Sequence, residues 1–334
     1  MRSIISRGMS ERSAVHFGGP DLPPRRLRDL LRERIDAVPA GGEIAWATYY
    51  FRDRDLAAAL MAASDRGVKV TLQVEGRPRR KSANAGVLAM LEGHGLRGGL
   101  KVHRSLPGPL HAHLHSKIYT FSHPAPTALV GSFNPSGDVP ECSDVIAEIG
   151  DQDRGHNLLV EFSQGALPLA LRDHVRAMHK PLARLRNLGS VEGNGTRAWF
   201  YPRLHGAIAE RAIARAGRIS GCISHLKPGA LTSTLISAAR KGASVRLIVH
   251  DTGRRVPEAV ISELVAAGVD IRRFVHPEGL PMHAKFLLAD DTAWFGSFNF
   301  NPRSRWLNRE VLLASRDEAI VAALAERFEQ IASA

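Results

Sequence analysis

Apolar side chains in the first half of the chain alternate between helical and strand-like spacing. Residues 24–38 and 55–67 repeat apolar positions every three or four residues, which predicts two amphipathic helices. Residues 42–51 and 68–76 are dense in apolar, β-favouring side chains and predict two strands. Strands that alternate with helices favour an α/β fold, in which a mostly parallel or mixed sheet is covered by helices on both faces.

The second half repeats this order of elements. Helical spacing over 202–217 and 230–242 alternates with strand-like stretches over 218–226 and 243–251. Ile219 follows Ile44 by 175 residues, and Gly242 follows Gly67 by the same 175. We therefore expect two copies of one α/β unit, arranged as two lobes related by a pseudo-twofold axis.

This repeat sets the expected domain boundaries. An N-terminal extension is predicted over 1–24, a first lobe over 25–185 and a second lobe over 186–334. The basic, glycine-containing stretch 181–197 is the expected linker between the lobes. A length of 334 residues is consistent with two domains.

Each half ends in a histidine-containing segment that is followed by a second strand. The segments are LHSKIYTF (114–121) with TALVGSFN (127–134), and MHAKFLLAD (282–290) with TAWFGSFN (292–299). Because side chains alternate along a strand, His115 and Lys117 share one face, as do His283 and Lys285. An imidazole beside an ammonium group is costly in a core unless an anion meets the pair. Finding that arrangement twice predicts a binding site for an anion.

A phosphodiester is the anion that these residue types suit. Its cleavage requires a nucleophile, a proton donor for the leaving alkoxide, and positive charge around the phosphoryl oxygens. Two imidazoles can divide the first two tasks, because a free imidazole titrates near neutral pH. If the pseudo-twofold axis brings the halves face to face, one pocket is lined by the following residues: His115, Lys117, Asn134, His283, Lys285 and Asn299.

These segments resemble the phospholipase D superfamily, whose mark is two HxKx4D motifs, each followed by a glycine-serine and asparagine element. The second copy is complete, with His283, Lys285 and Asp290, and the run GSFNFNPRSRWLNRE is similar to bacterial cardiolipin synthases. In the first copy Ser122 stands where the motif has aspartate. The resemblance implies that this aspartate is structural, so we expect Ser122 to affect local rigidity more than chemistry.

The resemblance also implies roles. His115 is expected to be the nucleophile that forms a phosphohistidine, and His283 the general acid and then the general base. Lys117, Lys285, Asn134 and Asn299 are expected to hold the nonbridging oxygens, with Ser132 and Ser297 as weaker substrate-binding candidates. Water or an alcohol could then accept the phosphoryl group, which permits both hydrolysis and transfer.

A histidine nucleophile needs its second ring nitrogen held, usually by a carboxylate. Glu310 follows Asn299 by 11 residues and Glu148 follows Asn134 by 14. We expect each carboxylate to orient the histidine of its own half. Arg303 and Arg305 are either partners for a second phosphate or simply solvated.

A metal site is the competing interpretation of the HxHxH pattern. His111, His113 and His115 would share one face of a strand. No carboxylate close by in the sequence completes such a site, so the sequence predicts no metal and no cofactor. Without a metal, His111 and His113 are expected to line the entry to the pocket or to satisfy local hydrogen bonds.

The net charge of +12 predicts a polyanionic partner. The leading hypothesis is an enzyme acting on phospholipid, as a cardiolipin synthase-like phosphatidyltransferase or a phospholipase D. The alternative is a nuclease of the same superfamily, and a noncatalytic phosphate-binding module is a third. One chain carries both half-sites, so a monomer suffices for catalysis.

Location follows from what the chain does not carry. No stretch of about 18 apolar residues predicts a transmembrane helix, and the apolar run within residues 1–13 is too short for a secretory signal. We expect a cytoplasmic protein that binds anionic membranes peripherally through charge. Cys142 and Cys222 are too few for a disulfide framework and are expected to be free thiols.

Overall fold

The computed structural model describes residues 12–80, 82–104, 108, 111–137, 143–149, 154–178, 189–202 and 207–334. Within these residues the first half forms a seven-stranded sheet in the order β1-β7-β6-β5-β2-β3-β4. Its strands are β1 (Arg12–Gly18), β2 (Glu43–Thr48), β3 (Lys69–Glu75), β4 (Gly99–His103), β5 (Ile118–Phe121), β6 (Thr127–Gly131) and β7 (Asn157–Ser163). Its helices are α1 (Arg26–Asp36), α2 (Arg54–Asp65), α3 (Ala85–His94), α4 (Ser143–Ile149) and α5 (Ala166–Ala177).

The described part of the second half forms an eight-stranded sheet in the order β12-β11-β10-β13-β14-β15-β9-β8. Its strands are β8 (Ser190–Gly193), β9 (Thr196–Tyr201), β10 (Arg218–Ile223), β11 (Ser244–His250), β12 (Asp270–Phe274), β13 (Lys285–Ala289), β14 (Thr292–Gly296) and β15 (Glu310–Ser315). Its helices are α7 (Ile208–Ile213), α8 (Ala230–Arg240), α9 (Glu258–Ala266), α10 (Pro302–Trp306) and α11 (Glu318–Ser333).

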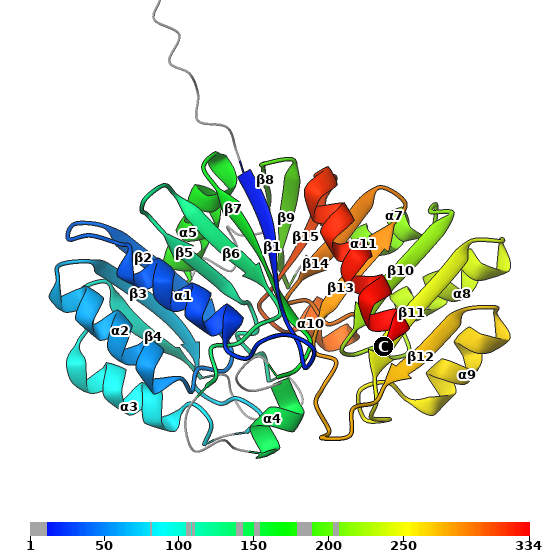
Figure 1. Cartoon of the computed structure of the whole chain (residues 1–334), viewed down its shortest axis with the longest axis horizontal. Helices are drawn as coiled ribbons and strands as arrows, with labels where there is room; N and C mark the ends of the chain where they lie inside the picture. The colour runs from blue at the N-terminus through cyan, green and yellow to red at the C-terminus, as the bar shows by residue number, and fades with distance from the viewer. Residues whose placement is uncertain are drawn as a thin grey trace, which may run out of the picture.

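The two sheets have the same topology, which confirms the repeat and the α/β fold. In each half three strands run parallel (β2, β3 and β4, or β10, β11 and β12), and the strands beyond them pair antiparallel. Each sheet is therefore mixed. Figure 1 shows the sheets side by side, with α1, α2 and α3 outside the first sheet and α8 and α9 outside the second.

The apolar core has three main parts. Two of them lie between each sheet and its outer helices, and the third lies between the two sheets. Alternation along β5 divides the side chains, since Ile118 belongs to the central core and Tyr119 to the outer one. Helices α5 and α11 contribute to the central core, and the rings of Phe162 and Phe295 stack across it with centroids 6.4 Å apart. This central contact holds the two halves in register.

The first lobe begins earlier than the sequence boundary at residue 25. Strand β1 lies within the predicted extension, yet it pairs with β7 from Arg12 to Gly18. Val15 and Phe17 pack against the central core, and this burial of apolar side chains stabilises the pairing of β1 with the sheet. In the second half β9 occupies the equivalent place beside β15. The boundary at 185/186, much of the predicted linker, residues 1–11 of the extension and Cys142 lie outside the described residues.

Candidate active site

Both predicted histidines are attached to the opposite half of the molecule. The peptide N–H of His115, just before β5, donates to the carbonyl of Arg309 at 2.8 Å. The peptide N–H of His283, just before β13, donates to the carbonyl of His156 at 3.1 Å. These two bridges cross between the lobes in opposite directions and bring the HxK segments to a common interface.

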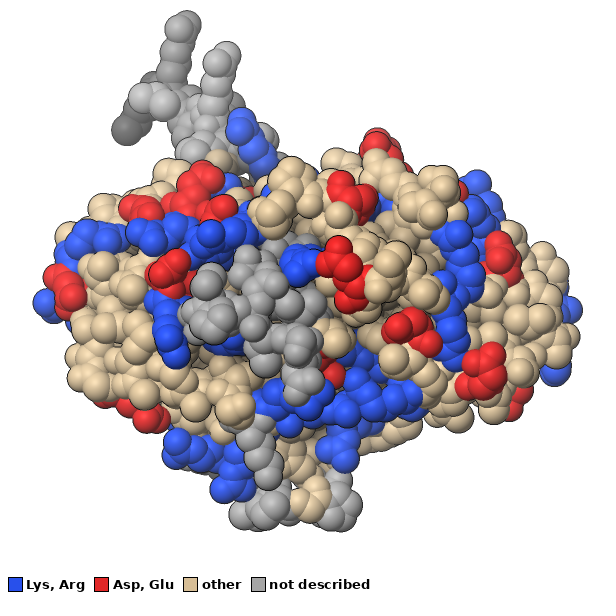
Figure 2. All heavy atoms as spheres, turned by 60° about the horizontal axis from the view of Figure 1, so that its bottom comes forward, with Lys and Arg blue, Asp and Glu red and all other residues tan. Residues whose placement is uncertain are grey.

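One pocket of about 440 Å³ opens at this interface. His115 and Asn134 from the first half line it together with His283 and Asn299 from the second. Lysine and arginine side chains from both halves surround them, namely Arg79, Lys227, Arg254, Arg255 and Arg303. Figure 2, which looks at the molecule from the side of α4, shows Lys and Arg gathered near the middle of this face.

A buried carboxylate orients His115. Its Nδ1 lies 2.8 Å from Oε2 of Glu310, the first residue of β15, and both side chains are buried. Burial would raise the pKa of Glu310, but the electrostatic interactions with His115 and Lys117 and the hydrogen bonds from His115 and Ser297 outweigh it and lower that pKa. Burial, opposed by Glu310 and assisted by Lys117, lowers the pKa of His115 to about 4. His115 is therefore a neutral imidazole at neutral pH, and its Nε2 carries the free lone pair.

The prediction that Glu310 serves the histidine of its own half is wrong. His283 is held instead by an amide, because its Nδ1 lies 2.8 Å from Oδ1 of Asn157. The Nδ2 of Asn157 donates to the carbonyls of Ile149 and Gly155, so the oxygen of this amide must face the imidazole. Asn157 begins β7 as Glu310 begins β15, so the two residues are equivalents in the repeat.

Glu148 lies in the pocket wall but binds arginines. Its carboxylate lies 2.9 Å from Arg254, 3.4 Å from Arg255 and 3.8 Å from Arg79. The expectation that it orients His115, the histidine of its own half, is therefore contradicted, because Glu310 holds His115. Asn157 was not predicted from the sequence, because a carboxylate was the expected partner of the histidine and an uncharged asparagine at the start of a strand gives no such signal.

The two lysines lie behind their histidines. Each Nζ donates to the carbonyl of the histidine two residues earlier at 2.7 Å, and Lys285 Nζ also lies 3.2 Å from His283 Nε2. Burial lowers the pKa of Lys117 to about 7, although Glu310 opposes this effect. Burial and the charge of Lys117 lower the pKa of Lys285 well below its usual range. Burial and the neighbouring Lys285 likewise lower the pKa of His283. An entering phosphate would relieve this accumulation of positive charge.

The two asparagines of the GSFN elements expose amide atoms to the pocket. Asn134 Oδ1 accepts the peptide N–H of Tyr50 at 3.1 Å, which leaves its Nδ2 directed elsewhere. Among the described residues neither Asn134 Nδ2 nor Asn299 Oδ1 has a hydrogen-bond partner, although both atoms are buried. Such orphaned polar atoms are costly, so a ligand is the natural partner.

The serines of the same elements support the residues that hold the histidines. Ser297 Oγ donates to Glu310 at 2.6 Å, and Ser132 Oγ donates to Asn157 at 3.1 Å. Both serines are fully buried, and neither lines the pocket. Their predicted role in substrate binding is replaced by a positioning role.

Glycine precedes each serine because two strands come very close there. A Cβ on Gly131 would lie 2.1 Å from the carbonyl oxygen of Leu158, and one on Gly296 would lie 2.3 Å from that of Val311. Gly296 also has a φ of 141°, which other residues rarely adopt. The glycines therefore let β6 and β14 approach the strands that carry Asn157 and Glu310.

Asp290 and Ser122 lie at the far end of their strands from the histidines and have one shared task. Asp290 accepts the peptide N–H groups of Gly217 and Arg218, at 2.9 to 3.2 Å. Ser122 Oγ accepts the peptide N–H of Glu43, the repeat equivalent of Arg218, at 2.7 Å. Serine thus keeps the bond that aspartate makes in the complete motif.

Several pocket residues were not singled out from the sequence. The ring of Tyr49 packs between two histidines, with centroids 5.1 Å from His113 and 4.9 Å from His115. His225 and the fully buried Arg255 line the opposite wall. Their positions could have indicated them, because Tyr49 directly follows β2 and His225 lies two residues after the repeat-related strand β10.

The two arginines that follow the second GSFN element differ in placement. Arg303 lines the pocket and donates to the carbonyl of His111 at 2.9 Å. Arg305 forms an ion pair with Glu210 instead, so a phosphate partnership for Arg305 is not supported.

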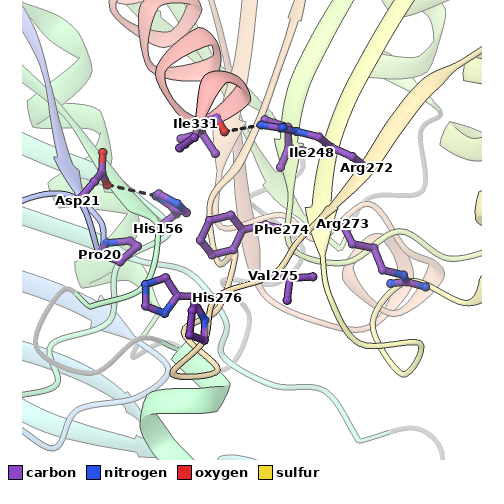
Figure 3. A pocket seen from close by; sticks show the side chains of 12 residues that line it. Pro20, Asp21, His156, Ile248, Arg272, Arg273, Phe274, Val275, His276 and Ile331 are labelled. Carbon is purple, nitrogen blue, oxygen red and sulfur yellow. Dashed lines mark hydrogen bonds and ion pairs between the residues drawn. The ribbon is translucent and has the colours of Figure 1, made fainter.

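A second cavity of about 450 Å³ lies behind His283. Figure 3 shows His156 between Asp21 and Phe274, with Arg272 reaching the carbonyl of Ile331 and Arg273 directed away. The two cavities have no lining residue in common, but one backbone hydrogen bond links them, because the carbonyl of His156 accepts the peptide N–H of His283.

Comparison with known proteins decides the family. The family model described as "Cardiolipin synthase, PLD-like domain" matches residues 33–159 and 211–332, more than half of the chain. The chain belongs to this family. Membership confirms the resemblance to the phospholipase D superfamily and places the chain in an enzyme family of phosphatidyltransferase type. None of the helices in the described residues is long and apolar enough to span a bilayer.

Relatives match a limited stretch of this cardiolipin synthase-like chain. Minor cardiolipin synthase ClsB of Bacillus subtilis (strain 168) is 35% identical over 126 residues, which are 35% of this chain and 31% of that protein. Cardiolipin synthase A of Cronobacter sakazakii is 35% identical over 102 residues, or 29% and 20% of the two chains. The chain thus aligns with less than a third of the length of these relatives.

Solved structures share the fold over nearly the whole chain. Phosphatidylserine synthase from Haemophilus influenzae superposes with a TM-score of 0.66 at 12% identity, covering 95% of this chain and 85% of that one. Polyphosphate kinase from Porphyromonas gingivalis gives a TM-score of 0.61 at 15% identity, covering 96% and 50%. At such identities the likeness establishes the two-lobed fold.

Proposed function

We propose that this protein transfers or hydrolyses a phosphodiester through a covalent phosphohistidine. The observation that carries the proposal is the environment of His115. It is a neutral imidazole with one nitrogen held by Glu310, in a pocket that a second imidazole lines and two buried lysines flank. A nucleophile, a proton carrier and positive charge for the phosphoryl oxygens therefore meet at one place.

In the first step His115 attacks phosphorus. Nδ1 keeps its proton and donates a hydrogen bond to Glu310, so the lone pair on Nε2 forms the N–P bond while the bond from phosphorus to the leaving oxygen breaks. The leaving oxygen takes a proton from His283. The phosphorylated imidazole carries a positive charge, which the adjacent carboxylate of Glu310 stabilises.

In the second step His283 removes a proton from water or an alcohol, whose oxygen attacks phosphorus and releases His115. Water gives hydrolysis and an alcohol gives transfer. Burial and the neighbouring lysines lower the pKa of His283, and the negative charge of a bound phosphate would raise it and favour the protonated form. His283 is protonated only briefly, between the proton transfers of the two steps, so the neutral amide of Asn157 is an adequate hydrogen-bond partner.

The two histidines have different hydrogen-bond partners, and this difference supports the assignment of His115 as the nucleophile. A phosphorylated imidazole remains cationic for the lifetime of the intermediate, so the nucleophile benefits most from a carboxylate. Glu310 holds His115, whereas Asn157 holds His283. The repeat alone treats the two histidines as equal, and this difference favours His115.

The phosphoryl oxygens are proposed to be held by the side chains around the histidines. Lys117 and Lys285 are buried amines whose charged form a bound phosphate would favour, and Asn134 Nδ2 is a buried amide without a hydrogen-bond partner among the described residues. Asn299, the equivalent residue of the other half, lines the pocket and would donate through its Nδ2, since its Oδ1 is an acceptor. Donors fixed in place before the reaction need no reorganisation as charge develops, which is the main source of such stabilisation.

A phospholipid is the substrate that the family favours. The matching family model and the aligned relatives carry the name cardiolipin synthase. The basic pocket walls would meet the phosphates of a membrane surface, and attraction to anionic lipid would contribute about 1 kcal/mol for each Lys or Arg near it. The acyl chains can stay in the bilayer while the headgroup enters the pocket.

A nuclease is the second candidate, and the chemistry of the walls favours it. The described lining contains Ile149 and two tyrosines but is otherwise polar or charged, with basic residues from both halves. A sugar-phosphate backbone would suit such a surface, and its binding would weaken steeply with salt.

Product analysis distinguishes these candidates. The protein is incubated separately with phosphatidylglycerol vesicles and with single- and double-stranded DNA. We expect cardiolipin or phosphatidic acid from the vesicles and intact DNA. His115→Asn should abolish turnover, while the control His94→Asn, on the outer helix α3 beside Asp65, should keep it. Cleaved DNA with unchanged lipid would establish the nuclease, and full turnover by His115→Asn would refute the mechanism.

Membrane binding is tested without chemistry. We expect the protein to cosediment with vesicles that contain anionic lipid at low salt and to be released at high salt. Equal binding to neutral vesicles, or none to anionic ones, would contradict the proposed docking.

A further inference from the structure

A second group of ligating side chains lies at the edge of the candidate active site. His111, His113 and Glu75 each place a ligand atom within 4.8 Å of those of the other two. The histidines belong to the extended segment before β5, and Glu75 is the last residue of β3. The HxH pattern suggested a metal site that lacked a carboxylate, and the fold supplies that carboxylate from about 40 residues earlier.

The distances suit tetrahedral coordination. His111 Nε2 lies 2.9 Å from His113 Nδ1, and His113 Nδ1 lies 3.7 Å from Glu75 Oε2. Metal–ligand bonds of about 2.0 to 2.1 Å at tetrahedral angles place ligand atoms about 3.3 Å apart. The two distances fall on either side of that value, and the ligand atoms of His111 and Glu75 lie within 4.8 Å of each other, so small side-chain movements would accommodate an ion.

Glu75 is held as a ligating carboxylate is usually held. It is fully buried, and its oxygens accept the peptide N–H groups of Arg77 at 2.8 Å and Leu114 at 2.7 Å. Hydrogen bonds of this kind orient metal-binding carboxylates, and a buried negative charge needs a cation nearby.

The contact between the histidines points the same way. Two neutral ring nitrogens at 2.9 Å must share a single proton, with one nitrogen donating and the other accepting. A cation between them would take the place of that proton. The ring of Tyr49 packs against His113 and limits its rotation.

We propose that Glu75, His111 and His113 bind one divalent transition-metal ion, with Zn²⁺ as the best match. Two imidazoles and one carboxylate are a donor set that zinc favours, and they leave a fourth position for water or a ligand oxygen. His113 also lines the pocket of His115 and His283, so the site borders the proposed reaction centre. The ion would fix the segment that leads into His115, and no bond-making step proposed above passes through it.

Zinc binding is measured directly. The full chain is stripped with a chelator and titrated with ZnCl₂ by calorimetry, with no substrate present. We expect one equivalent to bind with micromolar affinity or better, and Co²⁺ to give the intense visible absorption of a tetrahedral site. His111→Ala and His113→Ala should each weaken binding by at least about 100-fold. Glu75 is buried, so circular dichroism first verifies that Glu75→Gln is folded. The Co²⁺ spectrum of this variant is then compared with that of the parent protein.

Two further variants separate this site from its alternatives. His94→Ala controls for nonspecific histidine binding and should leave the affinity unchanged. His115→Ala should also leave it unchanged, whereas a loss equal to that of His111→Ala would assign the ion to the three histidines and overturn the role of Glu75. Failure of the parent protein to bind zinc, or equal binding by His111→Ala, would overturn the site. These readouts do not depend on the proposed phosphodiester chemistry.

Discussion

Replacing Glu310 with glutamine tests the proposed role of the carboxylate behind His115. The substitution keeps the size of the side chain and removes its charge. Glu310 is 1% exposed, and its Oε2 meets His115 Nδ1 at 2.8 Å and Ser297 Oγ at 2.6 Å. Its Oε1 accepts Ser304 Oγ at 2.6 Å, so both carboxylate oxygens are used. Glutamine offers one acceptor oxygen and no charge, so the change weakens the support for the cationic phosphohistidine.

The size of the effect follows from this geometry. A hydrogen bond to a charged group contributes about 1.5 to 3 kcal/mol. Opposite charges about 4 Å apart attract by about 4 kcal/mol at the effective dielectric constant of proteins. Since about 1.4 kcal/mol corresponds to a tenfold change in rate, we expect kcat to fall between about 10-fold and 1000-fold. The change should appear in kcat because the stabilised charge develops during the reaction.

Turnover of a chromogenic phosphodiester measures this loss, with circular dichroism to verify folding. Glu161→Gln is the matched control, because Glu161 also holds a histidine, His16, at 2.8 Å, on β7 outside the described pocket lining. The control should retain its kcat. Since Glu310 raises the pKa of His115, its loss should also move the acid limb of the pH profile to lower pH. A folded Glu310→Gln protein within threefold of the parent kcat would refute the reasoning.

Other predictions concern stability and the second histidine. Among the described residues, burial in the fold lowers the pKa of six buried or half-buried histidines, namely His115, His156, His174, His225, His250 and His283. Their stabilising contribution is complete above pH 6.5 and is lost as the pH falls toward the folded-state pKa values, by up to about 1.4 kcal/mol per pH unit for each histidine. The urea midpoint should drop steeply between pH 6.5 and 4, and a constant midpoint would contradict this. Ser122→Ala should lower the free energy of unfolding by about 1 kcal/mol without changing kcat, because Glu43 N–H loses its acceptor. Ser122→Asp keeps an acceptor, so denaturant titration should give it the free energy of unfolding of the parent protein. Asn157→Asp should raise the pKa of His283 and shift the basic limb of the pH profile upward, and an unmoved limb would argue against His283 as the general acid.

Much of the candidate site was predictable because its signals are local. The HxK triplets and GSFN elements recur at matching positions, so His115, Lys117, Asn134 and their counterparts stood out from the sequence. The parts that sequence spacing misjudged are those that lie between the halves. Glu310 was assigned to the wrong histidine because spacing along one half gives no view of a contact across the interface.

The serines show the same limit at shorter range. Ser132 and Ser297 were candidates for substrate binding because they stand next to the pocket asparagines. Whether a hydroxyl faces a cavity or a neighbouring strand depends on how closely the strands pack, and here each hydroxyl faces the next strand and holds Asn157 or Glu310.

The sequence by itself determined the duplicated α/β unit, most of its strands and helices, and the residue types of the chemistry, because periodicity and short motifs are properties of neighbouring residues. The tertiary structure alone decided which groups meet. His115 and Glu310 are 195 residues apart, and His283 and Asn157 are 126 apart. Such pairs form only when two sheets pack on a shared core. The free energy of that packing comes from contacts between residues that are far apart in the sequence.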